Sequence, residues 1–352
     1  MEKSIKPVEL QKQRDLSLDV AKGVLIILVV IGHGIQYAFG NHSGHIIFDD
    51  CLFRAIYCFH MPAFMLISGW LFYFSIKKGF LYVLKSKIRT IIVPLLTYAF
   101  IYAVMYVAVN QQITPPIIHI IKKALTSFWF LPSLFLNSAV VGLMCHFFRC
   151  DMVRLAVLVL ISFMLLFIGR PATYMFMFGC FITGYLYNVY LHKPLIIRMR
   201  KAQYLVVPVI IFFVCYYFFR YDTFVYTTGV RVWQDGQFSW SMLCIDFQRF
   251  VIGIVASLCF FALIGYYKLM PKKFISFITN CSKYSLGIYC FSMICYFLYV
   301  SAYDYFPFSM EFNHAYALLI ALFFVIVAYY FFKFCDKFPL LRMLFLGSRT
   351  AS

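Results

Sequence analysis

The sequence predicts an all-α protein, a polytopic integral membrane bundle of about ten transmembrane helices with both termini in the cytoplasm. Of its 352 residues, 64% are hydrophobic and only 12% are charged, whereas soluble domains are about half apolar and roughly 25% charged. Aromatic residues make up 21% of the chain, and such side chains suit lipid and its interfaces. Apolar runs also recur at about the 20-residue length that a bilayer requires.

The apolar runs define ten predicted spans in order along the chain. The run at 153–168 is short, and only "GRPA" separates it from the next one. The ten runs lie at 18–38, 53–76, 91–110, 127–147, 153–168, 172–191, 203–220, 246–267, 282–301 and 314–334.

Most Lys and Arg residues fall in one alternating set of connections, which predicts the orientation. This set comprises the N-terminus, 77–90, 148–154, 192–202, 268–283 and the C-terminus. Because excess Lys and Arg mark the cytoplasmic side, both termini lie inside, and an even number of spans is required. We expect a multi-pass protein of the cell inner (cytoplasmic) membrane, with no cleaved signal peptide. The net charge of +18 therefore sets topology and does not indicate binding to nucleic acid.

We expect one transmembrane domain over 1–352, with 1–17 as a cytoplasmic N-terminal segment and 335–352 as a cytoplasmic tail. The longest outer connection, 221–245, is rich in Trp, Tyr and polar residues. It is either an aromatic belt at the interface or part of a sugar-binding surface.

The first span, "LDVAKGVLIILVVIGHG", contains ionisable residues that are costly in hydrocarbon, at roughly 2.5–3.5 kcal/mol each. Lys22 and His33 are eleven positions apart, so they share a helix face about 16 Å apart along the axis. Asp19 lies on the same stripe. Lys22 alone could snorkel to the inner interface, and His33 alone could bond to a neighbouring helix; their common face favours a function.

The second span, "FRAIYCFHMPAFMLISGWLF", places His60 at nearly the depth of His33, with Arg54 above it. Pro62 should kink this helix and free backbone carbonyls, as happens beside cavities. The sequence predicts a polar chamber open to the outside. A hydrogen-bonded pair of core histidines is the alternative.

These segments also carry a resemblance. "RDLSLDVAKGVLIILVVIGHG", "FHMPAFMLISGWLF", "FWFLPSLF", "YMFMFGCFITGYL" and "CSKYSLGIYCFS" together resemble the membrane acyltransferase-3 family, in its fucose 4-O-acetyltransferase-like branch. The resemblance implies about ten spans and transfer of an acyl group, usually acetyl, from cytoplasmic acyl-CoA to a hydroxyl of a cell-surface or lipid-linked glycan. The family's Arg-x10-His pattern maps to Lys22 and His33, and Ser292 stands where relatives often have His.

A mechanism follows as a hypothesis. Lys22, with Asp19, would bind acyl-CoA at the inner end, and the extended pantetheine arm would reach His33. His33 would be the general base, although an acyl-histidine intermediate is chemically allowed. His60 would orient His33 or the acceptor, and Arg54 would stabilise the oxyanion.

Two further residues are predicted to bind the acceptor substrate. Arg249 lies near the outer end of its span, where an interface anchor is the alternative interpretation, and Trp129 belongs to "FWFLPSLF".

Other functions have less support in the sequence. A transporter or flippase for a lipid-linked glycan is the main alternative, but such proteins often show internal repeats and none is visible here. An inactive scaffold is a third hypothesis. We expect no metal cofactor, since HExxH and zinc-type Cys/His spacings are absent; His42 and His45 in "GNHSGH" lack a further ligand set.

Overall fold

The computed structural model describes residues 15–39, 46–110, 117–168, 172–197, 202–230, 232–234, 237–303 and 311–348. Nearly all of these residues are helical. The longer helices are α1 (Leu16–Tyr37), α3 (His60–Ile76), α5 (Val93–Asn110), α7 (Phe130–Phe147), α8 (Asp151–Ile168), α9 (Ala172–Leu191), α12 (Trp240–Ile264), α14 (Ser285–Tyr303) and α15 (His314–Cys335). The shorter ones are α2 (Cys51–Tyr57), α4 (Phe80–Lys87), α6 (Ile117–Ser127), α10 (Val206–Phe218), α11 (Val225–Thr228), α13 (Lys272–Lys283) and α16 (Pro339–Leu346).

The structure confirms an all-α polytopic membrane bundle. Within the described part of the chain, seven helical stretches are long and apolar enough to cross a bilayer. The other three predicted spans are also helical, as α8, α9 and α10. The helices match the predicted hydrophobic runs because a helix rises about 1.5 Å per residue and needs about 20 apolar residues to cross the hydrocarbon.

Several connections that the sequence analysis treated as loops or a tail are helices. The predicted connection 77–90 contains α4, 268–283 contains α13, and the predicted tail contains α16. α13 and α6 carry apolar residues on one face and Lys residues on the other. Such amphipathic helices bury only one side, so they contain no long continuous apolar run. For this reason the apolar runs did not predict them. The orientation of the termini stays a prediction.

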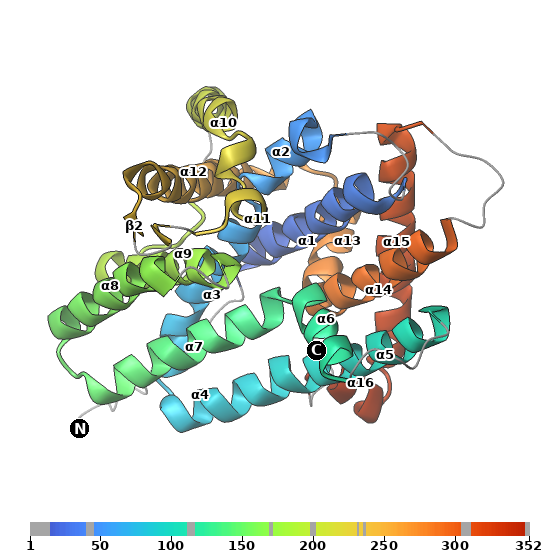
Figure 1. Ribbon diagram of the computed structural model, residues 1–352, viewed down its shortest axis with the longest axis horizontal. Coiled ribbons are helices and arrows are strands. Elements are labelled where there is room, and N and C mark those ends of the chain that lie inside the picture. The colour runs from blue at the N-terminus through green and yellow to red at the C-terminus, as the bar shows by residue number, and fades with distance from the viewer. Residues whose placement is uncertain are drawn as a thin grey trace, which may run out of the picture.

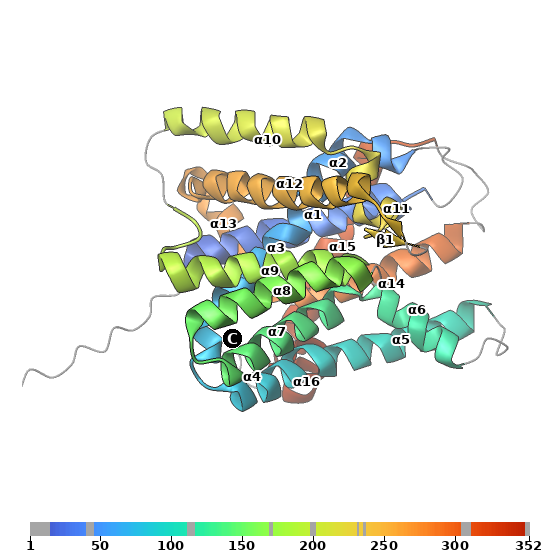
Figure 2. The ribbon, with the colours of Figure 1, turned by 60° about the vertical axis from the view of Figure 1, so that its left-hand side comes forward.

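α1 lies at the centre of the bundle. It packs against α2, α3, α12, α13, α14 and α15, and most of its residues are buried, including Leu25, Ile26 and Val30. In Figure 2, α10 and α12 lie along one side of the bundle while α4 and α16 lie along the opposite side. Figure 1 shows α1 running between these groups of helices. The helix with the predicted motif therefore crosses the protein interior.

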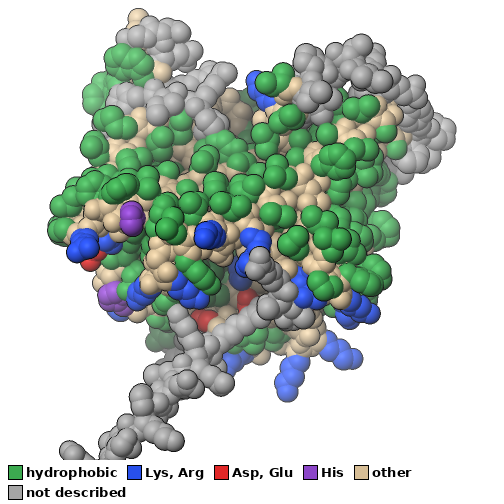
Figure 3. All heavy atoms as spheres, turned by 90° about the horizontal axis from the view of Figure 1, so that it is seen from below, with side chains coloured by type: hydrophobic (Ala, Val, Ile, Leu, Met, Phe, Trp, Pro, Cys, Tyr) green, Lys and Arg blue, Asp and Glu red, His purple; other side chains and the backbone are tan. Residues whose placement is uncertain are grey.

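The surface agrees with a membrane location. In Figure 3, Lys and Arg gather across the lower half of the face, next to a broad hydrophobic area. Many large apolar side chains on the outer helices are exposed, among them Phe100 on α5, Ile210 on α10 and Phe323 on α15. Such a surface is typical of helices that face lipid.

α3 and α9 approach each other closely because glycines lie at their contact. A Cβ added at Gly69 would lie 1.9 Å from the Phe181 carbonyl oxygen, and one at Gly184 would lie 2.1 Å from the Leu66 oxygen. Small residues are the usual means of bringing membrane helices together. This contact holds α3, which begins with His60, against its neighbour.

The predicted span at 53–76 is broken, as Pro62 indicated. α2 ends at Tyr57, two turn residues follow, and α3 begins at His60. The break lies one turn before Pro62, because proline cannot donate to the carbonyl four residues earlier and clashes with it. The disrupted turn leaves carbonyl oxygens that side chains can bond.

The connection at 221–245, predicted to lie on the outer side, contains two short structures. α11 lies next to a two-stranded hairpin, in which β1 (Trp233–Gln234) pairs antiparallel with β2 (Gln237–Phe238). Trp233 and Trp240 are exposed. Tyr226 of α11 is also partly exposed, at 45%, and lines both cavities of the protein. The segment thus presents aromatic side chains to the surface and one of them also to the cavities.

Candidate functional site

His33 lies near the C-terminal end of α1, in a group of aromatic rings. The ring centroids of Tyr37, Tyr289 and Tyr296 lie 6.1, 6.4 and 6.3 Å from that of His33. Among the described residues, no hydrogen bond engages the imidazole, and its Nδ1 is fully buried. A buried polar atom without a partner is uncommon. The ring is therefore held by packing, and its nitrogens remain available for chemistry.

His60 is fixed by the break between α2 and α3. Its Nδ1 lies 2.8 Å from the Ile56 carbonyl oxygen. A carbonyl only accepts, so Nδ1 carries the hydrogen and donates it, and in the neutral ring Nε2 is left as an acceptor. His60 lines a smaller cavity that does not include His33, and Tyr57 lines the cavities of both histidines. The structure thus places the two predicted histidines on neighbouring cavities.

His33 lines a cavity of about 410 Å³, a size within the range of small-molecule sites. Its walls come from α1, α2, α6, α11 and α14, together with residues that precede α2 and α7. Aromatic side chains dominate the lining, and polar groups such as Gln36 and Thr126 are interspersed. Trp129, predicted to bind substrate, is part of this wall.

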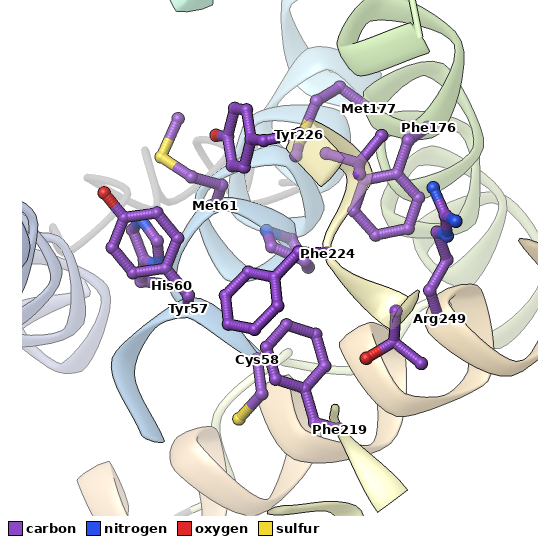
Figure 4. Close-up of a pocket in the computed structure, with 13 residues that line it drawn as sticks. Tyr57, Cys58, His60, Met61, Phe176, Met177, Phe219, Phe224, Tyr226 and Arg249 are labelled. Atoms are coloured by element: carbon purple, nitrogen blue, oxygen red, sulfur yellow. The ribbon is translucent and has the colours of Figure 1, made fainter. Parts of the chain in front are cut away.

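A second and much smaller cavity of about 30 Å³ lies beside the first. Figure 4 shows His60 and Tyr57 on one side of it and Arg249 on the other. Tyr57 and Tyr226 line both cavities, so they separate the two spaces. Tyr57 also contacts the His60 ring at 4.6 Å between centroids.

Tyr226 provides a hydroxyl that no hydrogen bond engages among the described residues. It lies in the predicted outer connection, where the protein desolvates the hydroxyl and thereby raises its pKa, and the nearby Tyr37 raises this pKa further. The hydroxyl therefore stays protonated and is a neutral hydrogen-bond donor at ordinary pH. Its ring lies 6.2 Å from that of Trp129.

Arg249 holds the segment that carries Tyr226. It is 2% exposed and donates to the carbonyls of Gly229 and Asp222 and to Thr228 Oγ1, at 3.0, 3.3 and 2.6 Å. Its Nε lies 3.3 Å from the carboxylate of Asp246. The bonds of the Nη atoms fix α11 over the cavity. Arg249 Nε and the two Asp246 carboxylate oxygens make no hydrogen bond among the described residues. Arg249 lines the small cavity but not the larger one.

Arg54 is engaged away from both cavities. Its Nε and Nη2 donate to the Phe219 carbonyl at 3.1 and 2.7 Å, and Nη2 also lies 3.2 Å from the Tyr216 carbonyl. These are among the carbonyls at the C-terminal end of α10, which have no partner within the helix. Arg54 lines neither cavity, so these contacts give it the geometry of a helix-capping residue.

Lys22 and Asp19 form an ion pair at the other end of α1. Their Nζ and Oδ1 atoms are 3.2 Å apart, and the Asp19 side chain is only 7% exposed. Ser282, at the end of α13, donates to the same oxygen at 3.4 Å. The residues that line the 410 Å³ cavity do not include Lys22. The structure therefore separates Lys22 from His33, as their spacing requires, and places them in different environments.

Sequence reasoning missed several residues of the cavity, including Gln36, Tyr57, Lys123, Tyr226 and Tyr289. The chain has 27 Tyr and 43 Phe residues, so no single aromatic stands out from the rest. Position 292, where relatives often have His, holds a fully buried Ser whose Oγ donates to the Tyr289 carbonyl at 2.9 Å.

One group of residues has the donor types of a metal site. Ligand atoms of Asp50, Cys51 and His314 lie within 4.8 Å of one another. Asp50 already accepts from the Phe53 amide at 2.8 Å, and one of its carboxylate oxygens lies 2.6 Å from His314 Nε2. These contacts tie α2 to α15 and account for the carboxylate. His42 and His45 lie outside the described residues.

Comparisons with known proteins identify the family. A family model described as an acyltransferase domain, Acyl_transf_3, matches residues 15–333. The chain belongs to this acyltransferase family. The match includes the segments that carry His33, His60 and Lys22, as the resemblance implied.

Two curated relatives are similar to part of the chain. The nodulation protein NolL of Mesorhizobium japonicum is 31% identical over 140 residues, which cover 39% of this chain and 37% of the relative. NolL of Sinorhizobium fredii is 30% identical over 122 residues, or 34% of this chain and 33% of the relative. The matching stretch thus spans about a third of each relative. No solved structure matches the chain.

Proposed function

We propose that this protein is an acyltransferase that moves an acyl group, acetyl as the first choice, from acyl-CoA to a hydroxyl of a glycan. The donor binds at the Lys22 end of α1, and the acceptor, a cell-surface or lipid-linked sugar, binds in the 410 Å³ cavity. The observation that carries the proposal is the His33 imidazole, which lines this cavity and has no hydrogen-bond partner among the described residues. Membership of the acyltransferase family supports the reaction type.

The reaction needs a base because a sugar hydroxyl is a weak nucleophile at neutral pH. In the proposed step, His33 takes the hydroxyl proton while the oxygen attacks the thioester carbonyl. The new C–O bond forms, the C–S bond breaks, and the departing thiolate of CoA receives the proton from His33. Atoms and charge balance without a metal or a redox partner.

The oxyanion that forms in this step requires a hydrogen-bond donor. Tyr226 is the group we assign to it, because this residue lines the cavity and its hydroxyl remains protonated. Arg249 then acts as a positioning residue by fixing α11. The contacts of Arg54 favour a structural role in which it positions α10, in place of the oxyanion role expected from the sequence.

His60 acts through Tyr57 in this proposal. Its Nδ1 bond to Ile56 fixes the ring, and the ring packs edge-on against Tyr57, whose hydroxyl donates to Gln36 at 3.3 Å. Both Tyr57 and Gln36 line the cavity with His33. We therefore propose that His60 supports the cavity wall on the acceptor side. Its Nε2 would accept a hydrogen bond.

The two substrates approach from opposite ends of α1. Lys22 and His33 are separated by about 16 Å along the helix axis, a reach comparable to an extended pantetheine arm. Lys22 would bind a phosphate of CoA as a point charge, and Asp19 would orient the Lys22 ammonium group. With the termini inside, this arrangement transfers the acyl group across the inner membrane to an outer acceptor.

The test uses the full-length protein, purified in detergent, with acetyl-CoA labelled in the acetyl group and a panel of glycans. We expect label to appear on the glycan, with release of free CoA. Reconstituted vesicles provide the second arm. Movement of a lipid-linked glycan without any covalent change would instead support the transporter alternative and overturn the proposal.

A further inference from the structure

The cavity that contains His33 has an asymmetric charge. Among the described residues that line it, Lys123 is the only Lys or Arg, and no Asp or Glu is present. Lys123 lies on α6 and is exposed, so it stands where the cavity meets its surroundings. A single ammonium beside an aromatic, partly enclosed space creates a positive potential that bulk water screens only in part.

The Lys123 ammonium has no carboxylate partner in the described part of the chain. Its Nζ lies 4.6 Å from the centroid of the Tyr106 ring, a cation–π contact that directs the charge without neutralising it. An ammonium has three N–H donors, and this contact leaves donors for an added ligand.

The neighbouring hydroxyl groups on α6 are bonded to the backbone and not to the Lys123 ammonium. Thr126 Oγ1 donates to the carbonyls of Lys122 and Lys123 at 2.9 and 2.8 Å, and Ser127 Oγ donates to the Lys123 carbonyl at 3.0 Å. They are thus committed to the helix backbone as donors. Ser127 in turn accepts from the Tyr289 hydroxyl at its carbonyl, at 3.3 Å, which links α6 to α14 beside the cavity.

Lys122, the adjacent residue, is a natural control. It is exposed like Lys123 but does not line the cavity. Consecutive residues on a helix point about 100° apart, so α6 presents only one of its two lysines to this space. Lys123 is therefore in the cavity wall because of its position on the helix. The presence of two adjacent lysines in the segment would not by itself place it there.

From these observations we propose that the acceptor carries an anionic group, a phosphate or a carboxylate, beside the sugar hydroxyl that is acylated, and that Lys123 binds this group. The inference rests on the proposed function, because it takes this cavity to be the acceptor site. The aromatic walls contact the sugar ring, and Lys123 adds a charge-assisted contact to the anion. Lys123 is a specificity-determining residue and takes no part in proton transfer.

The test measures binding and transfer separately, with the full-length protein in detergent. Three matched probes are a neutral methyl hexoside, the corresponding hexose 1-phosphate and the corresponding hexuronic acid; inorganic phosphate is the anion without a sugar. Binding is followed by the fluorescence of Trp129, which lines the cavity, with Trp129→Phe to identify its signal. Transfer is followed with labelled acetyl-CoA. The two anionic sugars distinguish phosphate from carboxylate.

We expect wild-type protein to bind at least one anionic sugar about tenfold more tightly than the neutral one, with a preference that weakens as salt rises. Lys123→Met should abolish this preference, Lys123→Arg should retain most of it, and Lys122→Met should leave it unchanged. Equal binding of neutral and anionic sugars, or a preference that survives Lys123→Met, would overturn the inference.

The two readouts separate the inference from the proposed function. A preference for an anionic sugar that depends on Lys123, without transfer to any bound sugar, would support the binding site and contradict the acyltransferase proposal. Transfer to neutral and anionic sugars with the same KM would support the acyltransferase proposal and overturn the anionic-acceptor inference. Tight binding of inorganic phosphate alone, with no gain from the sugar, would show a simple anion site and overturn acceptor recognition by Lys123.

Discussion

The two ends of α1 both carry ionisable side chains, but the structure engages them differently. At one end, Lys22 is paired with Asp19, and Ser282 of α13 bonds to the same carboxylate. At the other, His33 lines a large cavity and has no hydrogen-bond partner among the described residues. One helix thus has a satisfied charged end and an unsatisfied polar end.

The difference supports the proposal that His33 is the reacting group. A buried group that is fully bonded adds to a stable structure, whereas a buried group without a partner lowers stability unless a ligand completes it. The pair at Lys22 can hold a charge in place for a substrate phosphate. The free imidazole at His33 can receive and return a proton. The two ends therefore fit the proposal, in which one end binds the donor and the other carries out the reaction.

The largest expected effect is at His33. His33→Ala should reduce kcat for acyl transfer by about 10²- to 10⁴-fold, which is the usual contribution of a general base. The variant loses ring packing but no hydrogen bond among the described residues, so it should still fold in detergent with only a modest fall in thermal stability. Turnover of labelled acetyl-CoA is the measurement.

His146→Ala is the matched control, since His146 is an exposed histidine at the end of α7 and does not line either cavity. It should keep wild-type activity. Wild-type turnover by His33→Ala would remove His33 from the mechanism and erase the proposed difference between the ends.

A smaller effect is expected at Lys22. Lys22→Ala should raise KM for acyl-CoA about tenfold, as expected for loss of one charge-assisted contact of about 1.4 kcal/mol, while kcat for bound substrate changes little. Initial rates over a range of acyl-CoA concentrations give both values. Asp19→Asn should raise KM for acyl-CoA less, because it removes the ion pair that orients the Lys22 ammonium but leaves the ammonium in place. An unchanged KM in Lys22→Ala would contradict phosphate binding at this end.

The smallest effect on catalysis is expected at Arg54, which lies on α2 and donates to carbonyls at the C-terminal end of α10. Arg54→Gln should leave KM and kcat within about threefold of wild type, yet lower the free energy of unfolding by about 1–3 kcal/mol as the carbonyls of Phe219 and Tyr216 lose a donor. Thermal unfolding in detergent and turnover are measured together. A loss of kcat comparable to that of His33→Ala, with stability intact, would restore Arg54 as an oxyanion donor.

Much of the fold could be predicted from the sequence because the bilayer imposes a length on every span. Each of the ten apolar runs contains helical residues. The break before Pro62 follows from the missing N–H and the ring of proline. The short helices α4, α6, α13 and α16 were not predicted. Their hydrophobic face is one-sided, so packing against neighbouring helices decides that they fold.

The candidate site was predictable only in part. The shared face of Lys22 and His33, and the similar depth of His60, follow from helical geometry. The roles of Arg54 and Arg249 do not, because each guanidinium bonds to carbonyls from segments far away in the chain. Tyr226 and Lys123 enter the cavity from segments that no local pattern connects to α1.

By itself, the sequence determined that this chain is a helical membrane protein with a histidine and a lysine on one face of its first span. Hydrophobic length and helical periodicity are local properties, so they can be read without a fold. Tertiary structure alone decided which polar groups are satisfied and which remain free. That outcome depends on the neighbours each side chain meets when distant helices pack, and it is what distinguishes His33 from Arg54.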